Sequence, residues 1–204
     1  MITKDELGKL RSIRGLYQFV WHTRKKVCKV KFERYKAIQK CGLYKIFNDE
    51  IVPLSCIALK LYPSTYKIKP VVSNQEYDAI IMNEEGNIID YLEITWPQDG
   101  KRKADDAQKI LTRKYGNIYV YYPGEDIEEL CKYILKTCQN KAKKDYSNCT
   151  LVIVIDFVPP FPEHRQLYLQ KLKQIIKQVK NIQFRAKRVF LFILPFCKIY
   201  KICG

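Results

Sequence analysis

The chain has few of the features that mark secreted, membrane-spanning or zinc-binding proteins. It contains only two histidines, His22 and His164, and neither belongs to a Cys/His cluster with zinc spacing. Its eight cysteines form no C-x-x-C pair. The longest apolar runs, Leu151–Phe157 and Val189–Phe196, are too short to span a bilayer, and the N-terminus lacks the apolar run of a signal peptide. We therefore expect a cytoplasmic protein with reduced thiols and no membrane partner.

Several catalytic motifs are also missing. The sequence has no Walker A loop and no G-x-G-x-x-G, which leaves nucleotide hydrolysis and dinucleotide binding unsupported. It has no G-x-S-x-G, and neither histidine lies near a candidate nucleophile motif. A serine or cysteine hydrolase is therefore unsupported as well.

Positive charge is abundant, with a formal net charge of +16 and a pI near 9.4. Such a surplus attracts polyanions, so nucleic acid is the expected partner, with DNA favoured over RNA. An AT-rich coding sequence or an ordinary lysine-covered surface would give the same composition. The sequence also leaves a homodimer open.

The densest basic segment lies between Arg24 and Lys40. An imperfect apolar stripe runs along the same helical region and contains Val20, Val27, Val30, Phe32 and Tyr35. The alternatives here are a solvated helix face and a set of phosphate contacts. If these residues contact phosphates, the affinity for nucleic acid should fall steeply as the salt concentration rises. The candidate nucleic-acid-binding residues are Arg24, Lys25, Lys26, Lys101, Arg102 and Lys103.

One stretch carries a pattern with chemical meaning. Two apolar runs, Tyr77–Met82 and Asn87–Trp96, flank four residues that end in glycine, which predicts a β-hairpin. Asp78 lies near the start of the first run and Glu93 near the end of the second, so the two carboxylates should converge. Because side chains alternate along a strand, Glu93 and Thr95 should share one face. Asp90 belongs to the opposite face.

This arrangement resembles the PD-(D/E)XK nuclease superfamily, whose pattern is an acid on one strand, (Asp/Glu)-x-Lys on the next, and then a helix. The matching residues are Asp78, the tripeptide Glu93-Ile94-Thr95, and a helix from about Lys103 to Tyr115 that carries Gln108. Thr95 occupies the position of the family lysine, as in a branch of small bacterial proteins of this fold with Glu-x-Thr.

The resemblance implies a site for Mg²⁺ or Mn²⁺, with Asp78, Glu93 and the carbonyl of Ile94 as ligands. It also implies a lysine that has moved to a neighbouring element, and Lys109 or Lys103 is near enough in sequence. Gln108 could orient water or a phosphate. Without the resemblance, an Asp and a Glu on hairpin strands would be read as solvent-facing.

Family members often carry a further acid on the helix before the sheet. Glu33 is a candidate ligand of this kind, although a pair with Lys29 or Lys36 within its own helix is the simpler interpretation. Glu50 is the rival. We expect Glu50 to lie in the cap of a short helix that ends near Leu61.

The expected fold is α/β, with a mixed central sheet that includes the hairpin and is flanked by helices on both faces, as in restriction endonucleases. Residues 1–62 are expected to form a helical region packed on the core, broken around Gly15, and residues 63–204 the nuclease-like core, within one structural unit. Leu151–Phe157 and Val189–Leu194 read as buried strands. Lys198–Gly204 reads as a short basic tail.

The function implied by the resemblance is metal-dependent hydrolysis of nucleic-acid phosphodiester bonds. Two alternatives remain at this point. One is a catalytically inactive module that keeps the nuclease scaffold and binds nucleic acid. The other is an interaction protein whose basic helix meets an acidic protein partner.

Overall fold

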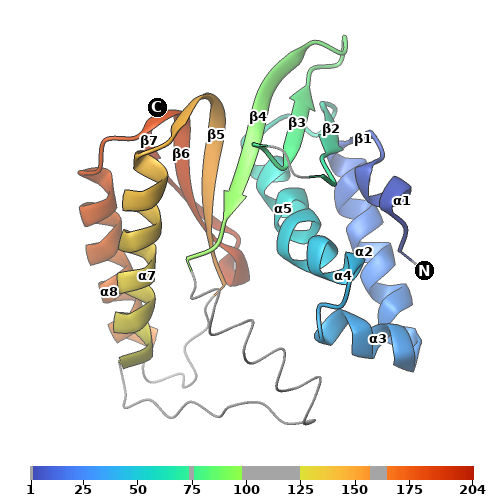
Figure 1. Cartoon of the computed structure of the whole chain (residues 1–204), viewed down its shortest axis with the longest axis horizontal. Helices are drawn as coiled ribbons and strands as arrows, with labels where there is room; N and C mark the ends of the chain where they lie inside the picture. The colour runs from blue at the N-terminus through green and yellow to red at the C-terminus, as the bar shows by residue number, and fades with distance from the viewer. Residues whose placement is uncertain (1, 74–75, 98–124, 157–164) are drawn as a thin grey trace.

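The computed structural model of the chain describes residues 2–73, 76–97, 125–156 and 165–204. Within these residues, one mixed seven-stranded sheet carries helices on both faces, which confirms the predicted α/β class (Figure 1). The strands are β1 (Arg11–Ser12), β2 (Lys67–Pro70), β3 (Ala79–Met82), β4 (Ile88–Thr95), β5 (Asp145–Ile155), β6 (Arg185–Ile193) and β7 (Lys198–Cys203). The helices are α1 (Lys4–Gly8), α2 (Ile13–Lys29), α3 (Lys31–Ile38), α4 (Leu43–Ile46), the π-helical η1 (Phe47–Ile51), α5 (Val52–Leu61), α7 (Glu125–Ala142), α8 (Arg165–Lys180) and the 3₁₀ turn η3 (Leu194–Phe196).

The strands lie in the sheet in the order in which they occur in the chain. β1 to β4 form an antiparallel meander, whereas β5 runs parallel to both β4 and β6. Parallel neighbours need a crossover connection, and α8 supplies it between β5 and β6. α7 precedes β5 and lies with α8 on one side of the sheet (Figure 1).

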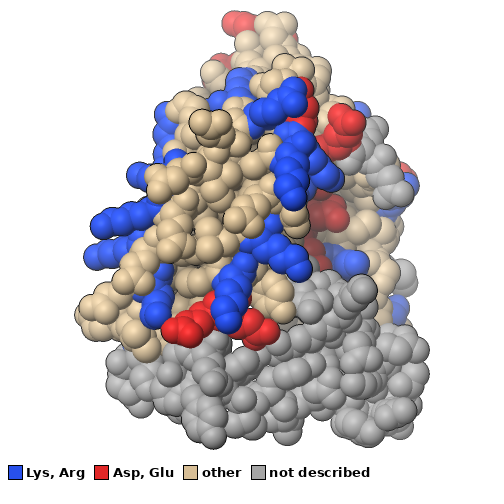
Figure 2. Space-filling view, turned by 60° about the vertical axis from the view of Figure 1, so that its left-hand side comes forward, with Lys and Arg blue, Asp and Glu red and all other residues tan. Residues whose placement is uncertain are grey.

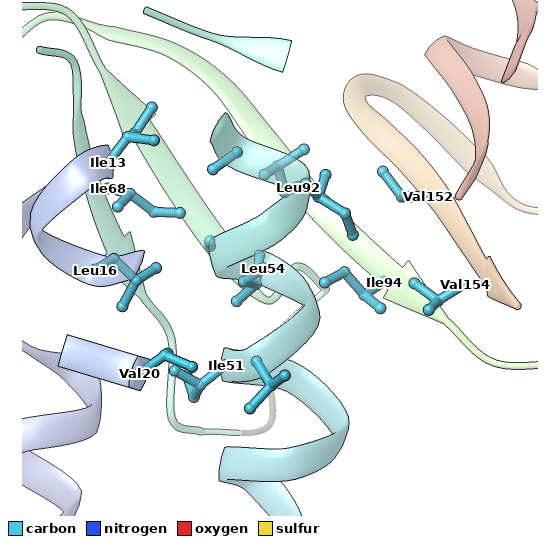
Figure 3. Packing of buried hydrophobic residues seen from close by; sticks show 14 of the residues in the cluster. Ile13, Leu16, Val20, Ile51, Leu54, Ile68, Leu92, Ile94, Val152 and Val154 are labelled. Carbon is cyan, nitrogen blue, oxygen red and sulfur yellow. The ribbon is translucent and has the colours of Figure 1, made fainter. Parts of the chain in front are cut away.

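A separate hydrophobic core lies on each face of the sheet, and β5 is therefore buried on both faces. Val152 and Val154 pack with residues of α2 and α5, as Figure 3 shows, whereas Leu151 and Ile153 pack with residues of α7 and α8. This alternation confirms the buried strand predicted from Leu151, which ends at Ile155. The first core also takes residues from the whole N-terminal third of the chain, including Leu7, Ile13, Leu16, Val20, Ile51 and Leu54.

The N-terminal region differs from the expected interrupted helix. Gly15 does not break it, because this residue lies in the first turn of α2, where its amide donates to Ser12 Oγ at 3.0 Å. The break falls at Val30, which has extended backbone angles between α2 and α3. The expected apolar stripe is also divided there, since Val20 and Val27 are buried but Val30 and the two aromatic residues after it are exposed. The region also contributes β1, which pairs with β2.

The predicted hairpin is confirmed. β3 and β4 pair antiparallel, and the connecting turn is closed by the amide of Asn83, which donates to the carbonyl of Asn87 at 2.9 Å. Asn83 also accepts from the amide of Asn87 through its side chain at 2.8 Å. Gly86 takes a φ of 94°, a backbone conformation that residues with a Cβ rarely adopt. A turn of this kind fixes the register of the two strands.

The helix predicted to begin at an Asn48-Asp49-Glu50 cap is part of a longer one. α4, η1 and α5 follow one another without a gap, and none of them has a side-chain cap. Pro53 lies in the first turn of α5, and a proline lacks the amide that a helix interior requires. The turn before α5 is the π-helix η1, so the helix continues through this point and does not begin there with a side-chain cap. Glu50 therefore lies inside the helix. Such π turns occur frequently at functional sites.

The C-terminal segment is not a tail. Lys198–Cys203 forms β7, which pairs antiparallel with β6 at the edge of the sheet. Exposed lysines are typical of edge strands, where they discourage pairing with other chains.

None of the described helices combines the length and the apolar character needed to cross a bilayer.

Candidate functional site

Asp78 lies just before β3 and binds β4 on both sides of Glu93. Its backbone amide donates to the carbonyl of Leu92 at 2.7 Å, and its carboxylate accepts from the amide of Ile94 at 2.6 Å. The side chain therefore takes the place of a strand partner where the chain enters the hairpin. This contact holds the carboxylate of Asp78 beside Glu93, as the hairpin pattern predicted.

The electrostatics of Asp78 reflect an accumulation of negative charge. Burial, with the neighbouring charges of Glu93 and Glu50, raises the pKa of its carboxyl group to about 7, against the lowering effect of the Ile94 amide. Burial also raises the pKa of Glu50, with the charges of Asp49 and Glu93 contributing. Glu50, Asp78 and Glu93 therefore act on one another as like charges. Perturbed carboxylates of this kind cluster at functional sites.

Lys141, near the end of α7, supplies a cation to this group. Its Nζ lies 2.7 Å from Glu93 Oε1 and also donates to the hydroxyl of Tyr146 at 3.0 Å. Burial acts to lower the pKa of Lys141, but these two contacts outweigh it and raise the pKa, so the ammonium form is stabilised. The side chains of Lys141 and Glu93 are only 17% and 15% exposed. The sequence reasoning missed Lys141 because it lies 48 residues from its partner.

A hollow of about 890 Å³ opens beside this ion pair. Its walls are β4 and the segment just before β3 on one side, and the end of α7 with the start of β5 on the other. Glu93 and Lys141 lie on its lining, together with Tyr77, Tyr91 and Tyr146. The volume falls within the range of about 300–1,000 Å³ that is usual for small-molecule sites.

Glu33 does not join the acidic group. It lies on α3, where its carboxylate pairs with Lys36 at 3.6 Å and accepts from the hydroxyl of Tyr44. The pair with Lys36 was the simpler interpretation of the sequence. The helix-borne acid that affects Asp78 is Glu50, the rival candidate.

Other predicted site residues are distributed as follows. Arg24, Lys25 and Lys26 are exposed on α2, on the side of the sheet opposite α7. Thr95 ends β4 and shares the face of Glu93, as predicted. Five candidates lie outside the part of the chain that the structure describes: Lys101, Arg102, Lys103, Gln108 and Lys109.

The opposite face of β4 holds a separate polar network around Asp90, whose side chain is 1% exposed. Its carboxylate pairs with Arg188 and accepts from the hydroxyls of Tyr62 at 2.6 Å and Thr150 at 2.7 Å. Burial acts to raise the pKa of Asp90, but these contacts outweigh it and lower the pKa. The network faces the core under α5, and Asp90 lies on the face of β4 opposite Glu93, as predicted.

The carboxylates of the site are suited to a hard cation. Mg²⁺ takes oxygen ligands, keeps several waters, and is usually bound through one or two protein carboxylates. Asp78 and Glu93 provide two such groups, and their mutual repulsion would be relieved by a positive ion. Among the described residues, no group of three or more His, Cys, Asp or Glu side chains is arranged to hold a metal.

The raised pKa of Asp78 gives a testable dependence of stability on pH. A carboxyl group with a pKa near 3.8 when unfolded and about 7 when folded favours folding below pH 3.8. That contribution is lost as the pH rises to 7. Asp78→Asn keeps an acceptor oxygen for Ile94 but cannot ionise. The unfolding free energy of the wild type should therefore fall relative to that of Asp78→Asn between pH 5 and 7, by at most about 1.4 kcal/mol per pH unit, and level off above.

Urea unfolding of both proteins from pH 5 to 8.5 measures this difference. A difference that stays constant over the whole range would mean that Asp78 ionises as an ordinary surface carboxylate.

No protein-family model, curated protein or solved structure gave a significant match to the chain.

Proposed function

We propose that the protein hydrolyses phosphodiester bonds of nucleic acid with the help of Mg²⁺ or Mn²⁺. One observation carries the proposal: Asp78 and Glu93 meet at the end of the hairpin, and a lysine ammonium lies 2.7 Å from Glu93 at the wall of a hollow. Phosphoryl transfer requires positive charge on the phosphate and an activated water, and this group of residues can provide both.

The order of elements supports the same proposal. The antiparallel meander of β1 to β4 ends in the strand with Glu93, α7 precedes β5, and β5 lies parallel to β4. The resemblance to the PD-(D/E)XK superfamily calls for the hairpin with its two acids, which β3 and β4 form, whereas the helix that it implies at about Lys103–Tyr115 lies outside the described residues. α5 covers the other face of the sheet and follows directly on the π turn that carries Glu50.

In this proposal the carboxylates of Asp78 and Glu93, with the main-chain carbonyl of Ile94, hold the cation, and Glu50, not Glu33, is the helix-borne acid whose charge acts on Asp78. A bound divalent ion would neutralise charge on the scissile phosphate and lower the pKa of a water molecule. Asp78 must be ionised to act as a ligand, so its raised pKa makes binding stronger above pH 7.

Lys141 takes the role first considered for Lys103 and Lys109. Its ammonium group reaches Glu93 from α7, and its raised pKa keeps it protonated at neutral pH. A fixed cation at this point can stabilise negative charge that develops on the phosphate. Thr95 leaves the usual lysine position without a charge, and Lys141 restores one from a different element.

The surface of the protein suits a polyanionic substrate. Arg24, Lys25 and Lys26 are exposed on α2, where the ammonium of Lys25 lies 5.0 Å from the centre of the Trp21 ring. Figure 2 shows further lysine and arginine side chains spread over the face of α7 and α8. A broad positive field attracts nucleic acid from many directions and concentrates it near the site.

Substitution of Lys141 tests the proposal. Lys141→Met should lower metal-dependent cleavage by about 10²–10³-fold while leaving metal binding intact, because it removes only the charge that stabilises the reacting phosphate. Lys141→Arg should retain part of the activity. Cleavage of labelled single- and double-stranded DNA and RNA, with calorimetric titration of Mn²⁺ beside it, gives both measurements.

Lys143→Met is the matched control, because Lys143 is exposed two residues away and its loss should change the cleavage rate little. Cleavage by Lys141→Met at the rate of the control would remove Lys141 from the mechanism.

A second candidate function is a catalytically inactive module that binds nucleic acid or an acidic protein partner. The observation that favours it is the ion pair itself, since Lys141 already balances the charge of Glu93. In that case the wild type would bind nucleic acid without binding a divalent metal.

A further inference from the structure

Three tyrosines line the hollow next to the acidic group. Tyr77 and Tyr91 lie against each other with ring centroids 4.6 Å apart and a tilt of 43°. Tyr91 is two residues before Glu93 on the same face of β4, so its ring is a direct neighbour of the carboxylate. The wall on the other side contributes Tyr146, which is bound to Lys141 through its hydroxyl. The hollow thus has an aromatic side and a charged end.

The aromatic side is suited to a flat ring. Nucleic-acid bases stack on tyrosine rings with little dependence on sequence, because every base has a π face. Tyr77 and Tyr91 are only half-buried, which leaves part of each ring open to a ligand. A hollow of about 890 Å³ is large enough for a single nucleotide.

The charges around the hollow argue against a ligand that is mainly phosphate. Glu76 and Asp145 lie on its lining with Glu93, and Asp145 is paired with Arg185 at 3.0 Å. The cations on the lining, Lys141 and Lys144, both lie at the end of α7 or just after it. A phosphate group would therefore lie at that end, and the rest of the ligand would be an uncharged ring against the tyrosines.

We propose that the hollow holds the unpaired base of the nucleotide next to the bond that is cut, stacked on Tyr91 and Tyr77. This inference rests on the proposed function, because Glu93 and Lys141 belong both to the hollow and to the catalytic group. Bases within a duplex are stacked on one another and enter such a hollow only if they are flipped out. The protein is therefore selective for single strands or unpaired ends.

The test uses a 12-nucleotide single strand with one 2-aminopurine, and the matching duplex, both in EDTA so that no cleavage occurs. The fluorescence of 2-aminopurine should be quenched when it stacks on the tyrosines of the wild type. Tyr91→Ala should weaken single-strand binding about tenfold or more and abolish the quenching, whereas Tyr91→Phe should behave like the wild type. Duplex binding should change little in either variant.

Thermal melting separates misfolding from loss of the stacking contact, and the quenching in the wild type does not depend on any substitution. Unquenched 2-aminopurine in the wild type, or equal single-strand affinity in Tyr91→Ala and Tyr91→Phe, would overturn the base site. Cleavage assays with Mn²⁺ run in parallel separate the two proposals. Cleavage of duplex with no tyrosine-dependent binding leaves the nuclease and removes the base site. Quenching that depends on Tyr91 without any cleavage leaves the base site and removes the nuclease.

Discussion

Glu93→Gln is expected to reduce metal-dependent cleavage by at least about 10²–10³-fold. Glutamine keeps the size of the side chain and one acceptor oxygen, but it has no charge with which to bind a divalent ion. It also removes the partner of Lys141, whose Nζ lies 2.7 Å from the Glu93 carboxylate. One substitution therefore disturbs both the metal ligand and the position of the lysine, which is why its effect should exceed that of Lys141→Met.

Glu84→Gln is the matched control, since Glu84 is an exposed acid in the turn of the same hairpin. Its cleavage rate should equal that of the wild type. The measurement is the initial rate of cleavage of a labelled strand at several Mn²⁺ concentrations. A rate for Glu93→Gln within a factor of a few of the control would mean that the activity arises elsewhere or from a contaminant.

Arg188→Met is expected to destabilise the protein by about 3–5 kcal/mol, because it leaves the buried carboxylate of Asp90 without its main partner. The guanidinium of Arg188 pairs with Asp90 and also donates to the hydroxyls of Tyr62 at 2.9 Å and Thr150 at 3.1 Å. Lys187 remains at 3.4 Å from Asp90, but its side chain is 44% exposed and gives only partial compensation. The network joins α5, β4, β5 and β6, so its loss affects the sheet as a whole.

Lys171→Met gives the comparison for an exposed pair. Lys171 lies 2.9 Å from Glu128, whose side chain is 56% exposed, and water and salt screen such surface pairs so that their loss changes stability little. Urea unfolding of both variants at pH 7 measures the two effects. Equal losses of unfolding free energy would show that the Asp90 network contributes no more than a surface contact.

The hairpin and its two acids could be predicted from sequence because the signals are local. Alternating apolar residues and a glycine turn define β3 and β4, and the ends of a hairpin necessarily lie side by side. The buried strand from Leu151 was predictable for a similar reason, since a short unbroken run of Val, Ile and Leu is typical of a strand covered on both faces.

The remaining parts of the site depend on contacts between distant segments. In the sequence, Lys141 cannot be told from the other lysines of a helix surface. It comes to Glu93 only because the fold places the end of α7 near β4. Glu50 could be named but not chosen over Glu33, because the choice depends on the π turn before Pro53. A proline after an Asn-Asp-Glu triplet normally indicates a helix start, and here the helix continues through it. Sequence alone does not separate these cases.

The edge strand β7 was missed for a different reason. Apolar and polar residues alternate only weakly along β7, and Ile202 is its one buried side chain, so the segment resembles a basic tail in the sequence. β7 is held in the sheet by backbone pairing with β6, which the amino-acid composition of the segment does not predict.

Calorimetric titration of Mn²⁺ into the wild type, Asp78→Asn and Glu93→Gln at pH 8 tests whether Asp78 and Glu93 form a metal site. We expect saturable binding by the wild type, weaker binding as the pH is lowered below 7, and loss of binding in both variants. No heat of binding to the wild type, with its affinity for nucleic acid intact, would rule out the metal-dependent nuclease and leave a nucleic-acid-binding module without catalysis.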